Sequence, residues 1–348
     1  MIHNFLTPRF RFLFDLLHGE ELEMIILRDQ DSIRFFTDFK SSNSFLVVLR
    51  KHIYVVTDPR YAGDLWATDH RLVRKIVKDP LSLVLQQLER LRGACGYDSS
   101  FLPGARENIH QINLSGHDLT SKIENFISIA DKETMKRFSK AASVTEKIEK
   151  QIPRLMKEGI REFKLRAEIS YLIHSSGCEE AFAPIVGFGE NTARIHTEPT
   201  NKKLKSEMPV LIDFGVRYKG VSTDITRSFW FGNSPDSEYQ NVRKAVKKAL
   251  KAAESKIANL ADCSKPGESA LNTLLTLHSE PSECLPHALG HGLGYKVHQF
   301  PRISGNSEHV FQTGQIITLE PGIYIPDKFG IRIEHDYLVT EKGVTKLI

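Results

Sequence analysis

The sequence predicts an α+β protein of two domains, and three features support this. The chain has 348 residues, which is more than the roughly 250–300 residues beyond which a single core stops growing. In the first third, short apolar runs of strand length alternate with helical patterns, as in a mixed α/β domain. The remainder twice repeats an order of helices followed by a strand hairpin. We expect the domains to cover residues 1–128 and 129–348.

The composition indicates a globular protein without nucleic-acid or membrane partners. Lysine and arginine total 47 and aspartate and glutamate 43, so the formal net charge is only +4. No apolar run approaches the ~18 residues of a membrane span, and Arg9, Arg11 and Asp15 interrupt the first apolar stretch, unlike a secretory signal. The four cysteines form no CxxC pair, which is typical of free thiols in a reducing compartment. We expect a cytoplasmic protein.

In the first domain, runs rich in β-branched and aromatic residues predict strands over 23–27, 45–49 and 52–57. Leucines spaced by three or four residues predict a helix over 81–91. A polar helix is expected over 117–130, just before the boundary. This half contains no cluster of metal-ligating residues and no phosphate loop.

The second domain is expected to begin with a long amphipathic helix over 135–155, capped by Asp131 and interrupted at Pro153. A second helix should cover 165–176, and a third should follow Ser234, with that serine as its cap. The hairpins are predicted from strand-like runs, which cover 208–216 with 221–232 and 315–325 with 330–340.

Each hairpin carries two acids where strands normally hold apolar residues: Asp213 with Asp224, and Glu320 with Glu334. A turn centred midway between the two acids of a pair would place them directly opposite each other, with Cβ atoms ~4.5–5.5 Å apart. Any single acid is explained as well by an exposed position. Four acids among β-branched and leucine neighbours instead indicate a compensating charge, which a bound divalent cation supplies.

A glycine-rich segment, LPHALGHGLGYKVHQFP, adds His287, His291 and His298. Three glycines spaced two apart argue against a helix and for close approach of the backbone to another group. The segment is not the HExxH zinc motif, because Ala288 stands where the glutamate would be. His196 is isolated, so spacing gives no reason to choose it. One histidine with four carboxylates suits manganese, cobalt or iron(II), and two such metals ~3.5–4 Å apart form a hydrolytic centre.

Five segments together resemble the pita-bread metallopeptidases, which include aminopeptidase P, prolidase, methionine aminopeptidase and creatinase. In chain order, the segments are IVGFGENTARIHTEPT, LIDFGVRYKGVSTDITRSFWFG, HALGHGLGYKVH, ITLEPGIYIP and GIRIEHDYLVTEKG. The runs FFTDFKSSNSFLVVL and YVVTDPRY resemble the smaller N-terminal domain of the aminopeptidase P and prolidase branch. The resemblance implies a C-terminal pita-bread (creatinase/aminopeptidase) fold over 129–348, preceded by a creatinase-like α/β domain over 1–128.

The resemblance also implies the metal ligands. Asp213 would bind one metal, His291 and Glu320 would bind the other, and Asp224 and Glu334 would bridge them. Two divalent ions are expected, with manganese preferred and cobalt, zinc and iron as alternatives.

Five residues would act on the substrate or support the site. By the same resemblance, His196, His287 and His298 would hold the substrate and stabilise the tetrahedral intermediate. Glu320 would transfer a proton, and Arg332 would support the cluster by pairing with a carboxylate.

The implied activity is an Xaa-Pro aminopeptidase, which hydrolyses the bond between an N-terminal residue and proline with a metal-bridging hydroxide as nucleophile. The partner is then a peptide with proline in its second position, and the resemblance suggests a homodimer. The alternative is an Xaa-Pro dipeptidase (prolidase), and a further one is a non-catalytic pita-bread module that binds peptide or protein. Loss of metal ligands would be the signature of that module, and all five are present.

Overall fold

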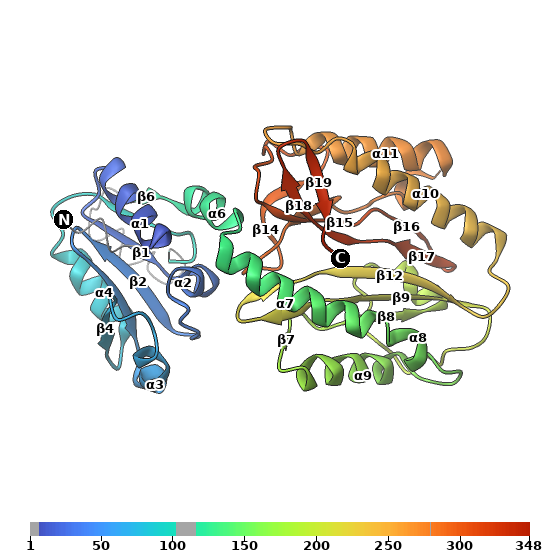
Figure 1. Ribbon diagram of the computed structural model, residues 1–348, viewed down its shortest axis with the longest axis horizontal. Coiled ribbons are helices and arrows are strands. Elements are labelled where there is room, and N and C mark those ends of the chain that lie inside the picture. The colour runs from blue at the N-terminus through green and yellow to red at the C-terminus, as the bar shows by residue number, and fades with distance from the viewer. Residues whose placement is uncertain (1–6, 102–115, 279) are drawn as a thin grey trace. The chain divides into compact units, whose positions relative to one another are not determined.

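The computed structural model describes residues 7–101, 116–278 and 280–348. The chain forms two compact units, Met1–Ile127 and Ser128–Ile348, and this division lies one residue before the expected boundary. Both units combine helices with β-sheet (Figure 1), as expected of an α+β protein. None of the helices in the described ranges is both long and apolar enough to span a membrane.

The first unit is built on a six-stranded sheet in the order β4-β3-β2-β1-β5-β6. Its strands are β1 (Met24–Leu27), β2 (Ser44–Leu49), β3 (His52–Thr57), β4 (Val73–Ile76), β5 (Cys95–Tyr97) and β6 (Gly116–Asp118). Its helices are α1 (Pro8–Gly19), α2 (Gln30–Thr37), α3 (Ala62–Trp66), α4 (Pro80–Glu89) and α6 (Thr120–Ser128). The three predicted strands and the leucine-rich helix are confirmed. The polar helix begins later than expected, because residues 116–118 pair with β5 as a strand.

In the second unit, the strands lie between two groups of helices (Figure 1). One group is α7 (Lys132–Glu149), α8 (Ile152–Leu155) and α9 (Glu162–Ser175), and the other is α10 (Ser237–Glu254) and α11 (Ser264–Leu277). Asp131 caps α7 as predicted, since its carboxylate accepts the Thr134 N–H at 2.8 Å. The cap of α10 was predicted wrongly: the carboxylate of Asp236 accepts the Glu238 N–H at 2.6 Å, so this helix begins beyond Ser234.

Each long strand predicted for the hairpins is in fact two shorter strands in different sheets. The first hairpin comprises β9 (Met208–Phe214), β10 (Val216–Tyr218), β11 (Val221–Ser222) and β12 (Ile225–Phe231). The second comprises β15 (Ile316–Leu319), β16 (Gly322–Ile325), β17 (Phe329–Arg332) and β18 (His335–Thr340). The other strands are β7 (Glu179–Glu180), β8 (Ile185–Phe188), β13 (Gly290–Gly292), β14 (Gln299–Ile303) and β19 (Gly343–Lys346). Asp224, Glu320 and Glu334 lie where the chain passes from one sheet to the next, and Asp213 is the second-last residue of β9, just before such a passage.

One of the two predicted hairpin registers is correct. Around Asp327, the pairs run from Gly322 with Arg332 to Ile325 with Phe329, as a turn midway between Glu320 and Glu334 requires. In the other hairpin the register is shifted by two residues.

The shift in the first hairpin places Asp213 opposite Thr226 instead of Asp224. Its cause is a two-residue turn in which Lys219 and Gly220 have φ of +48° and +93°. Such a turn matches the twist of the strands.

Candidate metal centre

All nine residues singled out in the sequence line one cavity of about 730 Å³ in the second unit. They are His196, Asp213, Asp224, His287, His291, His298, Glu320, Arg332 and Glu334. Three of the acids come from junctions between strands and Asp213 comes from the end of β9. The histidines come from two separate segments, one around His196 and the glycine-rich segment that carries the other three. Apolar side chains of Phe182, Ile185, Ile195 and Val297 complete much of the wall.

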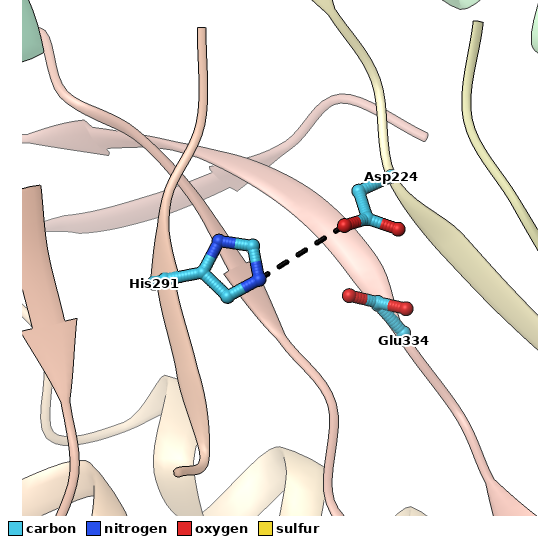
Figure 2. Close-up of side chains that lie close together, drawn as sticks. All are labelled: Asp224, His291 and Glu334. Carbon is cyan, nitrogen blue, oxygen red and sulfur yellow. Dashed lines mark ion pairs between the residues drawn. The ribbon is translucent and has the colours of Figure 1, made fainter. Parts of the chain in front are cut away.

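Three of these side chains are close enough to share one ion. Ligand atoms of Asp224, His291 and Glu334 all lie within 4.8 Å of one another, and Figure 2 shows the imidazole directed toward the two carboxylates. His291 Nε2 lies 3.9 Å from Asp224 Oδ2 and 3.7 Å from Glu320 Oε1. The cluster therefore offers carboxylate oxygens and one imidazole nitrogen around a common point.

Two glycines allow the backbone to carry His291 to this point. A Cβ on Gly290 would lie 2.0 Å from the Thr318 carbonyl oxygen, and one on Gly292 would lie 1.9 Å from that of Phe300. Strand β13 therefore runs too close to its neighbours for any side chain at these positions, as the glycine spacing predicted. A bulge between His291 and Gly292 re-aims the chain at the site, a common use of bulges.

The imidazole of His291 presents a lone pair to the acids. Its Nδ1 lies 3.0 Å from the Gly292 carbonyl oxygen, which can only accept a hydrogen bond, so Nδ1 carries the proton. Burial, together with His298, lowers the pKa of His291 to about 4, and the ring is neutral at physiological pH. A neutral ring with its other nitrogen fixed in this way is the form that binds metals.

The acids strongly disfavour one another's charge. Burial, followed by the repulsion of Glu334 and Asp213, raises the pKa of Asp224 well above its usual range. Burial and Glu334 do the same to the pKa of Glu320. The pKa of Glu334 rises to about 7, through burial and the charge of Asp213. The protein without a bound cation therefore cannot hold all four carboxylates ionised at low cost.

Arg332 is a cationic side chain that forms a direct hydrogen bond and ion pair with one of these acids. It is 2% exposed and donates to Asp213 Oδ2 at 2.5 Å, to the Tyr324 hydroxyl at 3.0 Å and to Thr226 Oγ1 at 2.9 Å. The Thr226 hydroxyl donates in turn to Glu334 Oε2 at 2.6 Å. The expected pairing of Arg332 with a carboxylate is confirmed, but one guanidinium leaves most of the negative charge uncompensated.

The sequence did not single out Thr226, Tyr324 and Asp336, which all support the site. Tyr324 lies within hydrogen-bond distance of His287 Nε2 (2.9 Å), and Asp336 accepts the Asp224 backbone N–H at 3.1 Å. Hydroxyl residues are common in strands, so nothing in the sequence marks Thr226 or Tyr324. Asp336 could have been found in the same way as the four predicted acids, because it too is an acid within a largely apolar, buried strand, HDYLVT.

Comparisons with known proteins agree with this geometry. Residues 136–341, more than half of the chain, match the model of metallopeptidase family M24. A protein of Mycoplasma pneumoniae, whose name assigns it provisionally as an Xaa-Pro aminopeptidase, is 27% identical over 362 residues, covering 98% of this chain and 96% of that protein. The solved structure of a recombinant prolidase from Thermococcus sibiricus has a TM-score of 0.87 at 26% identity and covers 98% of this chain and 97% of its own. Prolidase from Pyrococcus furiosus also has a TM-score of 0.87, at 24% identity, over 96% of this chain and 98% of its own.

The structural similarity extends over both units, so the expected pita-bread fold is confirmed. The sequence match covers the four acids and the histidine that converge in the cavity. This chain belongs to metallopeptidase family M24, in the branch of Xaa-Pro peptidases that contains aminopeptidase P and prolidase.

Proposed function

We propose that this chain is an Xaa-Pro aminopeptidase that works with two divalent cations, for which manganese is the first candidate and cobalt, zinc and iron are alternatives. The observation that carries the proposal is the convergence of four acids, three of them buried and Glu320 partly buried, and one neutral imidazole on a single cavity. A peptide with proline in its second position is the proposed substrate.

The residues fit such cations in both charge and chemistry. Asp213 Oδ1 is buried without a hydrogen-bond partner among the described residues, and the four acids outnumber the single bonded guanidinium of Arg332. Oxygen-rich sets with one imidazole suit metals of this class. In the proposed assignment, Asp213 holds one cation, His291 and Glu320 hold the other, and Asp224 and Glu334 lie between them.

Bound there, the cations would supply water that is deprotonated near neutral pH and would polarise the scissile carbonyl. The chain's own residues then handle protons and position the peptide. Burial raises the pKa of Glu320. Its carboxylate accepts a proton from the attacking water and returns this proton to the leaving proline nitrogen. His298 and His196 line the same cavity and donate hydrogen bonds to the carbonyl oxygen as charge develops on it.

A dipeptidase is the second candidate, and one residue favours it. Arg302 lines the cavity, and its guanidinium makes no hydrogen bond or ion pair with other residues that the structure describes. The carboxylate of an Xaa-Pro dipeptide directly follows the proline ring, so a free guanidinium there could bind it. The similarity to solved prolidases also supports this candidate.

Hydrolysis of Ala-Pro and Ala-Pro-Ala with added Mn²⁺ tests the proposal. We expect the tripeptide to be cleaved between alanine and proline, and loss of both reactions after chelation. If the chain is a dipeptidase, Arg302→Gln raises KM for Ala-Pro by about tenfold and leaves the tripeptide unaffected. Failure of the metal-loaded protein to cleave either peptide would refute both candidates.

A further inference from the structure

A cavity of about 410 Å³ in the second unit is separate from the cavity of the metal centre. It is lined by β12, by the segment around α8 and by one face of α10, and we call it the α10 cavity. The two cavities have none of their described lining residues in common, so the proposed hydrolysis does not use this one. Its size is within the ~300–1,000 Å³ range of small-ligand sites.

Aromatic rings form part of the wall of the α10 cavity. Phe229 and Trp230 of β12 and Tyr239 of α10 line it, and the ring centroids of Trp230 and Tyr239 lie 5.0 Å apart. Phe229 and Trp230 are only half-buried, so part of each ring remains accessible to a ligand. Aromatic faces of this kind stack on flat rings such as nucleobases.

The face of α10 that lines the cavity is basic. Four lining residues recur at i, i+3, i+4 and i+7 and so share one face of the helix: Gln240, Arg243, Lys244 and Lys247. The three cations are exposed, and none of them forms an ion pair with another residue in the described ranges. The described lining residues include no carboxylate. The cavity therefore carries three positive charges without a partner and should attract an anion.

A buried hydroxyl at the same place also lacks a partner. Tyr239 is 2% exposed, and its hydroxyl makes no hydrogen bond to any other part of the chain that the structure describes. Burial raises the pKa of Tyr239 while the charge of Arg243 opposes this, so the hydroxyl stays protonated and can donate. An unpaired buried hydroxyl costs free energy, and an acceptor oxygen of a ligand would supply its partner.

We propose that the α10 cavity binds a nucleoside phosphate, with the base against Phe229 and Trp230 and the phosphate held by Arg243 and Lys247. Aromatic rings alone would suit any flat apolar molecule, and cations alone would suit any anion. A nucleoside phosphate carries a flat ring and a phosphate in one small molecule, so it uses both features. This site does not depend on the proposed peptide hydrolysis.

The test measures binding of adenosine 5′-monophosphate (AMP) to the full-length protein by titration calorimetry and by quenching of Trp230 fluorescence in a Trp66→Phe background. Adenosine supplies the ring without the phosphate, and ribose 5-phosphate supplies the phosphate without the ring. Both Mn²⁺-loaded and chelated protein are used, because a phosphate could also bind to metal at the acids.

We expect AMP to quench Trp230 equally with and without Mn²⁺ and to bind at least tenfold more tightly than either fragment. Arg243→Gln and Lys247→Gln, both at exposed positions, should each weaken AMP binding by about tenfold and leave adenosine binding unchanged. Lys251→Gln is the matched control, because Lys251 is an exposed cation of the same helix that does not line the cavity, and it should bind AMP as the parent does.

Three results would overturn the inference. The first is AMP binding that is no tighter than that of the fragments, or that is unchanged in both Arg243→Gln and Lys247→Gln. The second is binding only in the Mn²⁺-loaded protein, which would place AMP at the metal centre. The third is binding of a single-stranded oligonucleotide without binding of AMP, which would indicate a nucleic-acid surface instead.

Discussion

Thr226 connects two buried groups of opposite charge, and its removal offers a measurable test of the network around the metal centre. The residue is fully buried; its hydroxyl donates to Glu334 Oε2 at 2.6 Å and accepts from Arg332 Nε at 2.9 Å. Thr226→Val removes both bonds with little change of shape. A bond to a charged partner contributes about 1.5–3 kcal/mol.

The lower end of that range applies to both bonds. Arg332 keeps its bonds to Asp213 and Tyr324, and Glu334, whose pKa burial and Asp213 raise to about 7, can take up a proton. We therefore expect Thr226→Val to lower the free energy of unfolding of the second unit by about 3 kcal/mol in chelated protein. Thr318→Val is the matched control, because Thr318 is an equally buried strand residue whose Oγ1 has no hydrogen-bond partner among the described residues.

The assay is urea unfolding followed by tryptophan fluorescence. The chain has two tryptophans, so a Trp66→Phe background leaves Trp230 as the reporter. Trp230 lies in the second unit, where its ring centroid is 5.0 Å from that of Tyr239. The control should be neutral or slightly stabilising, since it removes an unpaired buried hydroxyl. Equal losses in Thr226→Val and Thr318→Val would refute the described network.

Two further predictions concern the strand that carries His291 and the pH dependence of the acids. Gly292→Ala should destabilise the second unit by more than about 3 kcal/mol in urea unfolding, because its Cβ would lie 1.9 Å from the Phe300 carbonyl oxygen. Gly343→Ala is the control and should be nearly neutral, because its Cβ would lie 3.8 Å from the nearest atom, the Ile257 carbonyl oxygen. Similar losses of stability in both variants would contradict the described packing. Burial is the chief cause that raises the pKa of Glu334 from 4.5 to about 7, so this residue contributes stability that is lost as pH rises through about 7. Burial lowers the pKa of His291 to about 4, so His291 changes the stability only below its ordinary pKa of 6.5. The Tm of chelated protein should therefore fall between pH 6.5 and about 8, and less so in Glu334→Gln or with Mn²⁺; a Tm that rises in chelated protein would contradict this.

Local sequence patterns were sufficient for much of the architecture. The register around Asp327 could be predicted because a three-residue loop fixes the pairing of its flanking strands. The other register could not, because it depends on positive φ at Lys219 as well as Gly220, and lysine gives no signal for that conformation. The same limit explains the cap of α10, where Ser234 and Asp236 are both acceptable by residue type.

The residues of the site were easier to find than their contacts. Acids in apolar strand runs stand out in a sequence because burial of a charge requires a partner. The identity of the partner depends on tertiary packing: Arg332 meets Asp213 across two hairpins, and Thr226 lies between Arg332 and Glu334. No spacing rule connects residues so far apart in the chain.

The most direct test of the central claim is a titration of chelated protein with Mn²⁺, with heat of binding and Ala-Pro-Ala hydrolysis measured on the same samples. We predict two bound ions per chain, activity that appears only as they bind, and a loss of about 100-fold or more in His291→Ala. His174→Ala, which changes a histidine on α9 outside the cavity, should behave as the parent. Hydrolysis at the parent rate by chelated protein, or by His291→Ala without bound metal, would contradict the account.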